Sequence, residues 1–248
     1  MFARMTAWIT LGAALLTQPV AGALAEPARA VVELFTSQGC SSCPPADAVL
    51  AELSRQPDLI ALSFPVDYWD YLGWKDTLAQ SAFTARQKAY ARARSDRQVY
   101  TPQMIVNGIQ PCVGSDRARI ERSIRTATAG LASLPVTVAA VERDGVVTVT
   151  VSEAAQSVTP QKAEVWLLPV LRSHMVSINR GENRGRAVTY ANVVRAMNRI
   201  GEWNGGAAQY RVPAALARRD ADGYVVLLQT SDADRPSAIL GAAKGPGL

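Results

Sequence analysis

Two cysteines, Cys40 and Cys43, have the residue type and spacing that most directly indicate chemistry in this chain. They stand between a β-branched apolar run, residues 30–35, and a helix-forming run, residues 46–54. Two sulfurs at this spacing can close a disulfide, and a following helix N-terminus supplies free N–H groups and a positive dipole end that favour a thiolate. Because the thiolate is the nucleophile of thiol–disulfide exchange, the pattern predicts redox chemistry at this pair.

Other uses of the same spacing compete with this interpretation. Zinc needs further ligands at matched spacing, and the remaining candidates, Cys112 and the sole histidine His174, stand alone far along the chain. A copper carrier using the two thiolates is short of ligands for the same reason. A purely structural disulfide is a further alternative, because an oxidising compartment oxidises such cysteine pairs whether or not they take part in exchange. We predict no metal and no external cofactor, and we interpret Cys112 as a buried free thiol and His174 as an ordinary strand residue.

Residues 1–25 have the pattern of a secretory signal peptide. Arg4 precedes an apolar stretch, residues 8–16, and a small-x-small cleavage pattern, residues 23–25, precedes Glu26. The apolar stretch is short for a bilayer span, and no later run approaches transmembrane length. We therefore expect an exported protein, periplasmic or secreted, with no transmembrane segment after cleavage, in a compartment where disulfides persist.

The charge of the chain is moderately basic. Removing the 25 signal residues leaves 223 of 248 and lowers the formal net charge from +5 to +4, because Arg4 is lost. The densest basic stretch, residues 86–97, winds round a predicted helix and does not form one stripe. We therefore predict no nucleic-acid partner. The oligomeric state is not indicated by the sequence.

The mature chain changes character near Pro135. Residues 26–134 alternate predicted strands (31–35, 59–64, 103–106, 109–113) with predicted helices (45–54, 81–93, 116–129). In residues 135–248 two valine-rich runs, 136–141 and 146–151, flank an Asp144-Gly145 turn, and 163–168 and 224–229 are further strand candidates. Residues 190–200 fit a helix or a strand, and their neighbours favour a sandwich. We predict an α+β protein, with an α/β domain followed by a smaller, sandwich-like β domain.

A second motif, Tyr100-Thr101-Pro102, precedes a predicted strand downstream of the cysteines. With it, residues 26–134 resemble the thioredoxin superfamily. The resemblance implies that Cys40 is the attacking, more exposed cysteine and that Cys43 resolves. It also implies a cis Thr101-Pro102 bond beside the cysteine pair, in a loop that hydrogen-bonds the substrate backbone. The partner would be a protein or small-molecule thiol or disulfide.

Over the whole mature chain the resemblance is to the secreted family catalogued as domain of unknown function 1223. Four segments carry it: residues 33–47, 66–76, 100–104 and 180–183. That family has no established activity, so the resemblance implies a fold and a compartment more firmly than it implies a reaction. A non-enzymatic binding or assembly factor with a structural Cys40–Cys43 disulfide stays open beside the oxidoreductase hypothesis.

Residues around the cysteines depart from ordinary thioredoxins. Pro44 and Pro45 cannot lie beyond the first helical turn, so the helix should begin at or after Cys43 and leave Cys40 in the preceding loop. Glu33 lies one residue further upstream than the carboxylate that assists proton transfer in thioredoxins; it is either that group or a strand residue with a local partner. Asp47, in the first helical turn, is interpreted as complementing the helix dipole.

Four aromatic residues follow the second predicted strand, where α/β folds tend to place functional loops: Tyr68, Trp69, Tyr71 and Trp74. They form either a hydrophobic cap over the core or a wall for a peptide or small apolar ligand, with Tyr68, Trp69 and Trp74 binding substrate. The polar segment 180–184 either reaches the interface between the two parts or is a loop with internal salt bridges.

Overall fold

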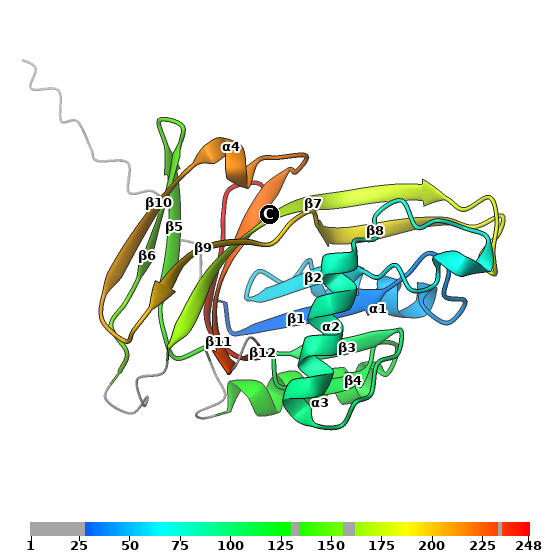
Figure 1. Ribbon diagram of the computed structural model, residues 1–248, viewed down its shortest axis with the longest axis horizontal. Helices are drawn as coiled ribbons and strands as arrows, with labels where there is room; N and C mark the ends of the chain where they lie inside the picture. The colour runs from blue at the N-terminus through cyan, green and yellow to red at the C-terminus, as the bar shows by residue number, and fades with distance from the viewer. Residues whose placement is uncertain (1–27, 130–133, 156–161, 233–234) are drawn as a thin grey trace, which may run out of the picture.

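A large mixed sheet runs through the computed structural model, which describes residues 28–129, 134–155, 162–232 and 235–248. Within these residues the large sheet has nine strands, and a separate antiparallel sheet has three (Figure 1). The predicted α+β class is confirmed. The predicted signal peptide, residues 1–25, lies outside the described residues.

The first half of the chain builds a helix-covered sheet, as the sequence predicts. Its elements are β1 (Ala30–Thr36), α1 (Pro44–Leu53), β2 (Leu59–Pro65), η1 (Asp70–Leu72), α2 (Ser81–Arg94), β3 (Gln103–Val106), β4 (Gln110–Val113) and α3 (Arg117–Thr128). Strand β1 pairs in parallel with β2 and antiparallel with β3, and all seven of its residues are buried. A run that is apolar on both faces suits such a central strand.

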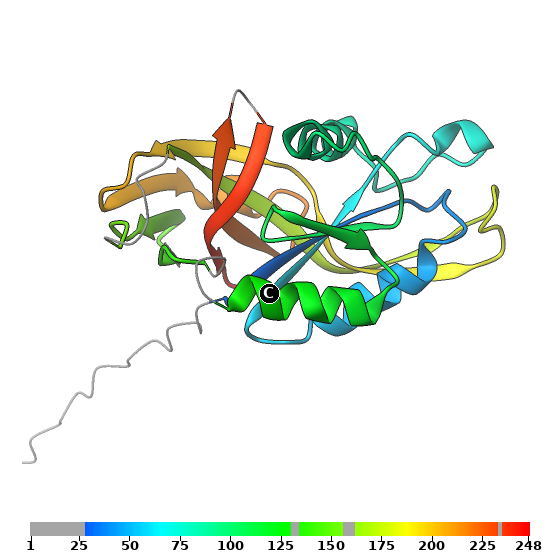
Figure 2. The same ribbon diagram turned by 90° about the horizontal axis from the view of Figure 1, so that it is seen from below.

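The helices cover the two faces of this sheet. Figure 2 shows α1 and α3 on one face and α2 on the other. On the α1 face, Val32 and Leu34 of β1 pack with Leu50 of α1. On the α2 face, Val31 and Phe35 pack with Phe83. Alternate residues of β1 therefore face different helices, as the period of a strand requires.

The second half of the chain is β-rich, as predicted. Its elements are β5 (Val138–Arg143), β6 (Val146–Val151), β7 (Ala163–Ser177), β8 (Ala187–Val194), β9 (Asn198–Trp203), β10 (Ala208–Pro213), α4 (Ala214–Ala217), β11 (Gly223–Asp232) and β12 (Arg235–Lys244). The β5–β6 hairpin turns at Asp144 and Gly145, both with positive φ. The ambiguous residues 190–200 form the end of β8, a three-residue connection at 195–197 and the start of β9.

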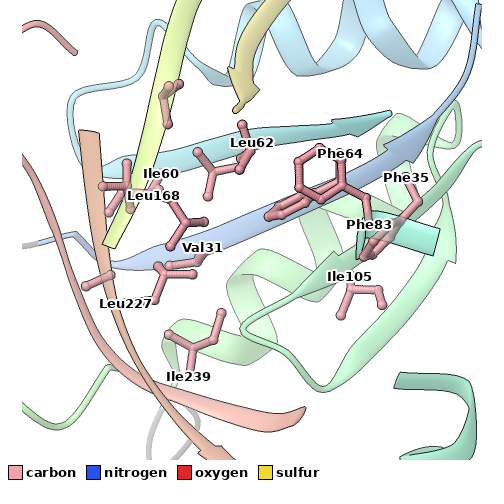
Figure 3. Close-up of a cluster of buried hydrophobic side chains, with 14 of the residues drawn as sticks. Val31, Phe35, Ile60, Leu62, Phe64, Phe83, Ile105, Leu168, Leu227 and Ile239 are labelled. Atoms are coloured by element: carbon pink, nitrogen blue, oxygen red, sulfur yellow. The ribbon is translucent and has the colours of Figure 1, made fainter. Parts of the chain in front are cut away.

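The large sheet continues across the expected boundary at Pro135. Its strand order is β12-β11-β7-β8-β2-β1-β3-β4, with β9 paired to β7, so that β8 joins β2 of the first half at the Ser63–Val193 pair. One buried cluster combines Val31 and Ile60 with Leu168 and Leu227 (Figure 3). The two halves therefore share a core.

Among the described residues, the sandwich-like arrangement lies within the second half. The small sheet, in the order β10-β6-β5, contributes Val147 and Val149 to a second cluster with Val165 and Val226 of the large sheet. The sandwich is thus formed by the small sheet and one end of the large sheet. The pairing of β8 with β2 places the other second-half strands in the large sheet. Such pairing between distant segments is not encoded in the local pattern of either segment.

Candidate functional site

The cysteine pair lies where the loop after β1 enters α1. Cys40 and Cys43 form a disulfide, with their Cα atoms 5.4 Å apart. Helix α1 begins at Pro44 with Cys43 as its N-cap residue, so the predicted helix start is confirmed. Cys40 lies in the preceding loop, where its Sγ is 3.4 Å from Ser42 Oγ. Ser42 itself is exposed.

Both cysteines are buried. Cys40 is 1% exposed and Cys43 0%, so Cys40 is not the accessible cysteine that the resemblance implied, and burial does not distinguish the two sulfurs. The spacing of the motif correctly leaves Cys40 on a loop, but side chains from distant segments cover that loop. Two of them come from the aromatic segment, and a third comes from the second half of the chain.

Trp69 joins the cysteine loop to the proline loop. The Thr101-Pro102 bond is cis, as the resemblance implied. Trp69 Nε1 donates to Thr101 Oγ1 at 2.8 Å, and a Cβ built on Gly39 would lie 2.9 Å from Trp69 Cβ. Pro102 lies near the first turn of α1, because a Cβ on Gly114 would meet both Pro102 Cβ and Ala46 Cβ at 3.1 Å. Pro102, Thr101 and Trp69 are therefore brought together around the cysteine loop.

Trp74 is anchored on the residue two positions before Cys40. Its Nε1 donates to Gln38 Oε1 at 2.8 Å, and the Gln38 backbone N–H donates to Asp76 Oδ2 at 2.8 Å. Tyr68 packs at the edge of the main cluster beside Trp69, with ring centroids 6.2 Å apart. These aromatic side chains are engaged within the protein, which fits the hydrophobic-cap alternative. Tyr71 differs, since it is 79% exposed.

Asn183 reaches the cysteine loop from the polar segment 180–184. Its Nδ2 donates to the backbone oxygens of Gln38 at 2.9 Å and Cys40 at 2.8 Å, and the residue is 1% exposed. The segment therefore reaches the first half of the chain, as one of the two sequence alternatives proposed.

Asp47 is a buried acid, whereas the sequence indicated only a residue that complements the helix dipole. It lies in the first turn of α1, four residues after Cys43, so that its side chain is on the same helix face. Thr36 Oγ1 donates to its Oδ1 at 2.8 Å, while the buried Oδ2 has no hydrogen-bond partner. Burial raises the pKa of Asp47 from 3.8 to about 7; the hydrogen bond from Thr36 lowers it, and the negative charge of Asp76 raises it further. The i, i+4 spacing from Cys43 was the available signal.

Glu33 faces away from α1. It shares the α2 face of β1 with Val31 and Phe35, where its carboxylate accepts from Arg86 Nε at 2.8 Å and from Tyr90 OH at 2.5 Å. Of the two sequence alternatives, the structure matches the strand residue with a local partner. The grouping of Glu33 with the catalytic cysteines is corrected, because β1 alternates its faces and Glu33 has the opposite parity to Val32 and Leu34.

Cys112 and His174 take no part in this site. Cys112 is a buried free thiol, as predicted, and burial raises its pKa to about 11. His174 is an exposed residue of β7. The described residues contain no group of three or more His, Cys, Asp or Glu that could hold a metal ion. None of the helices in those residues is both long and apolar enough to span a membrane.

Comparison with known proteins shows a family match over most of the chain. The family described as "Protein of unknown function (DUF1223)" matches residues 31–229. The chain belongs to this family. The match includes the cysteine loop, the proline loop and Asn183, and it confirms the resemblance stated from the sequence to domain of unknown function 1223.

Two solved structures are similar to this protein. The crystal structure of AGR_C_4864 from Agrobacterium tumefaciens has 35% sequence identity and a TM-score of 0.80, over 90% of this chain and 96% of that chain. HBP35 of Porphyromonas gingivalis has 12% identity and a TM-score of 0.59, over 88% of this chain and 74% of that chain, which shows similarity of fold. None of the curated proteins matches this chain.

Proposed function

We propose that this protein is an exported thiol–disulfide oxidoreductase or redox-linked protein that uses Cys40 and Cys43. The observation that carries the proposal is Asp47, a buried carboxyl one helical turn below Cys43 with an oxygen left unpaired. A buried carboxyl with a raised pKa costs stability, and a disulfide that serves only as a staple has no use for it. A carboxyl whose pKa burial raises to about 7, on the same helix face as Cys43, is suited to proton transfer.

The proposed exchange has two steps. A substrate thiolate attacks Cys40 Sγ, the Cys40–Cys43 bond breaks, and Cys43 leaves as a thiolate that takes a proton from the neutral Asp47 carboxyl. A second substrate thiolate then attacks the substrate sulfur of the mixed disulfide, and Cys40 leaves as a thiolate. The substrate dithiol is oxidised to a disulfide, and the protein is reduced by two electrons. The reverse steps reduce a substrate disulfide.

We assign substrate contacts to Pro102 and Thr101 in the proline loop, and to Tyr68, Trp69 and Trp74 in the aromatic segment. The substrate is a protein or small-molecule thiol or disulfide. The signal-peptide pattern of residues 1–25 supports a periplasmic or secreted location, where disulfides persist.

A second candidate function is a secreted binding or assembly factor in which the Cys40–Cys43 disulfide is structural. The near-complete burial of both cysteines favours it, because structural disulfides in secreted proteins resist reduction.

The equilibrium reduction potential of the Cys40–Cys43 pair separates the two functions. We expect a potential above about −300 mV, within the range of exchange proteins. It is measured by equilibrating the mature protein in dithiothreitol buffers of graded ratio and quantifying free thiols by alkylation and mass spectrometry. Cys112 serves as the internal reference, because a buried free thiol should stay reduced throughout. A potential below about −300 mV would favour the structural staple.

Replacing Asp47 with asparagine should flatten the pH dependence of stability. Between pH 4 and pH 7 the native Asp47 keeps its proton while the unfolded chain loses it, so the native state binds more protons and the free energy of unfolding falls as pH rises. A rise in pKa from 3.8 to about 7 corresponds to a loss of about 4 kcal/mol across that range. Urea unfolding of the oxidised proteins at pH 5 and pH 8 measures the effect. Asp47→Asn should lose most of the pH dependence of the free energy of unfolding and should be more stable than the wild type at pH 8.

Glu153→Gln is the matched control, because Glu153 is an exposed acid whose change should leave the slope intact. Burial also raises the pKa of Asp76, so the Asp47 variant should keep a part of the pH dependence of stability. Exchange with a model disulfide at pH 7 should also slow in Asp47→Asn. An unchanged exchange rate would remove Asp47 from the mechanism.

A further inference from the structure

The tip of the β7–β8 hairpin inserts one side chain into the cysteine loop. The hairpin extends along the large sheet to the segment that holds η1 (Figure 1). Within the tip, Asn183 is buried, while most of its neighbours are exposed: Arg180, Glu182, Arg184, Gly185 and Arg186. A single buried amide among exposed, mostly charged residues marks Asn183 as the point at which the tip is attached.

The tip completes a cover over the segment from Gln38 to Cys40. Trp69 packs on Gly39, Trp74 binds the Gln38 side chain, and Asn183 binds the backbone oxygens of Gln38 and Cys40. The tip also lies against the aromatic segment, because a Cβ built on Gly181 would be 3.2 Å from Trp74 Cβ. The described parts of the first and second halves thus meet around the Gln38–Cys40 segment, and both cysteines are buried.

Exchange cannot proceed through this cover. An incoming thiolate has to contact Cys40 Sγ on the side opposite Cys43 Sγ, since it displaces that sulfur. Cys40 is 1% exposed, so a part of the cover must move before a thiol of any size reaches it.

The hairpin tip is the part of the cover that is held least. Trp69 and Trp74 lie in the short connection between β2 and α2, and Asp76 fixes that connection by accepting from the backbone N–H groups of Gln38, Leu78 and Ala79. The base of the tip is fixed, because Ile178 is buried in a hydrophobic cluster with Leu78 and Trp74. Beyond Ile178, residues 179–185 are held to the first half by the two Asn183 hydrogen bonds and the contact of Gly181 with Trp74. In addition, Asn183 Oδ1 is buried without a hydrogen-bond partner. An unpaired buried acceptor is penalised when closed and regains water when open.

We propose that residues 179–185 form a lid over the redox pair, hinged at Ile178 and Arg186, and that the hydrogen bonds of Asn183 hold it closed against large thiols. The inference rests on the proposed exchange at Cys40. The observed rate is the fraction of open molecules multiplied by the rate of the open form. A bulky thiol needs a wider opening than a small one, so the lid discriminates against it.

The test compares two reductants on the oxidised mature protein: dithiothreitol and a dithiol attached to a polyethylene glycol chain. In Asn183→Ala the two hydrogen bonds that hold the tip are lost, so reduction by the bulky dithiol should accelerate about tenfold. Reduction by dithiothreitol should accelerate less, so the ratio of the two rates should move toward one. Rates are measured by quenching with an alkylating agent and quantifying Cys40 and Cys43 thiols.

A second variant and a control keep the test decisive. Asn183→Asp has the same shape but no N–H donor, and its carboxylate would face the two backbone oxygens, so it should open at least as readily. Arg184→Ala changes an exposed side chain of the same tip and should keep the wild-type rates and ratio. Wild-type rates and size ratio in both Asn183 variants would overturn the lid, as would an equal acceleration in Arg184→Ala.

Failure of the lid and failure of the proposed function give different results. An exchange-competent reduction potential with unchanged rates in the Asn183 variants rejects the lid alone. A staple-like potential together with size-dependent acceleration in those variants supports the cover and rejects the oxidoreductase.

Discussion

Replacing Cys43 with serine should convert Cys40 into a trap for its exchange partner. In the wild type, Cys43 displaces the partner from the mixed disulfide by intramolecular attack, so the adduct is short-lived. Without the Cys43 thiol this displacement cannot occur. Reduced Cys43→Ser protein mixed with oxidised glutathione should therefore accumulate the Cys40–glutathione adduct, whereas the wild type should end as the Cys40–Cys43 disulfide. Intact mass and peptide mapping distinguish these products.

Cys40→Ser is the matched control for this trap. Cys40 lies in the loop before α1, whereas Cys43 is the completely buried N-cap residue of that helix. The Cys40 variant should therefore form no adduct, and Cys112, with its raised pKa, should stay unmodified in both variants. An adduct on Cys43 in the Cys40→Ser protein would reverse the assignment of the attacking sulfur. If Cys43→Ser forms no adduct and the reduced wild type shows no thiol–disulfide exchange, the results favour the binding or assembly factor.

Replacing Arg86 with methionine should lower the free energy of unfolding by about 3–5 kcal/mol, because it leaves a buried charge unpaired. Arg86 is buried with Glu33, and its Nη2 also donates to Tyr90 OH and to Gln229 Oε1, both at 2.8 Å. Burial lowers the pKa of Arg86, but the charge of Glu33, the interaction with Tyr90 and the hydrogen bond to Glu33 together outweigh burial, so that the pKa is raised. The guanidinium carbon lies 5.6 Å from the centroid of the Phe64 ring, within cation–π range. Urea unfolding of the oxidised protein measures the loss.

Two further variants test why Arg86→Met lowers the free energy of unfolding. Arg117→Met removes the partner of Glu52 in a half-exposed ion pair and should cost less than about 1 kcal/mol. Adding Glu33→Gln to Arg86→Met removes the unpaired carboxylate and should restore a part of the stability. An Arg86→Met loss no larger than that of Arg117→Met would contradict a stabilising role for the buried pair.

The same buried network predicts one cooperative transition. Glu33 is on β1, Arg86 and Tyr90 are on α2, and Gln229 is on β11, so the network ties together strands from both halves of the chain. Signals from the two halves should therefore change at the same urea concentration in the wild type.

Features that depend on neighbouring residues were determined by the sequence alone. Helix α1 starts at Pro44 because two prolines cannot lie deeper in a helix, and the β5–β6 hairpin turns at Asp144-Gly145 because those residues tolerate positive φ. The cysteine spacing placed a disulfide at the start of that helix. The alternation of β1 also put Glu33 on the face of Val31 and Phe35, although it could not say which helix covers that face.

Features that join distant segments were decided only by the tertiary structure. Asn183 meets the Cys40 backbone across 143 residues of sequence, and Gln229 meets Arg86 across the same number. The pairing of β8 with β2 makes one sheet of two halves that look separate in composition. Spacing and periodicity describe contacts within a few residues, whereas burial depends on which remote surfaces the folded chain brings together. For that reason the motif correctly located the redox pair, while its closure under Trp69 and Asn183 required the packed structure.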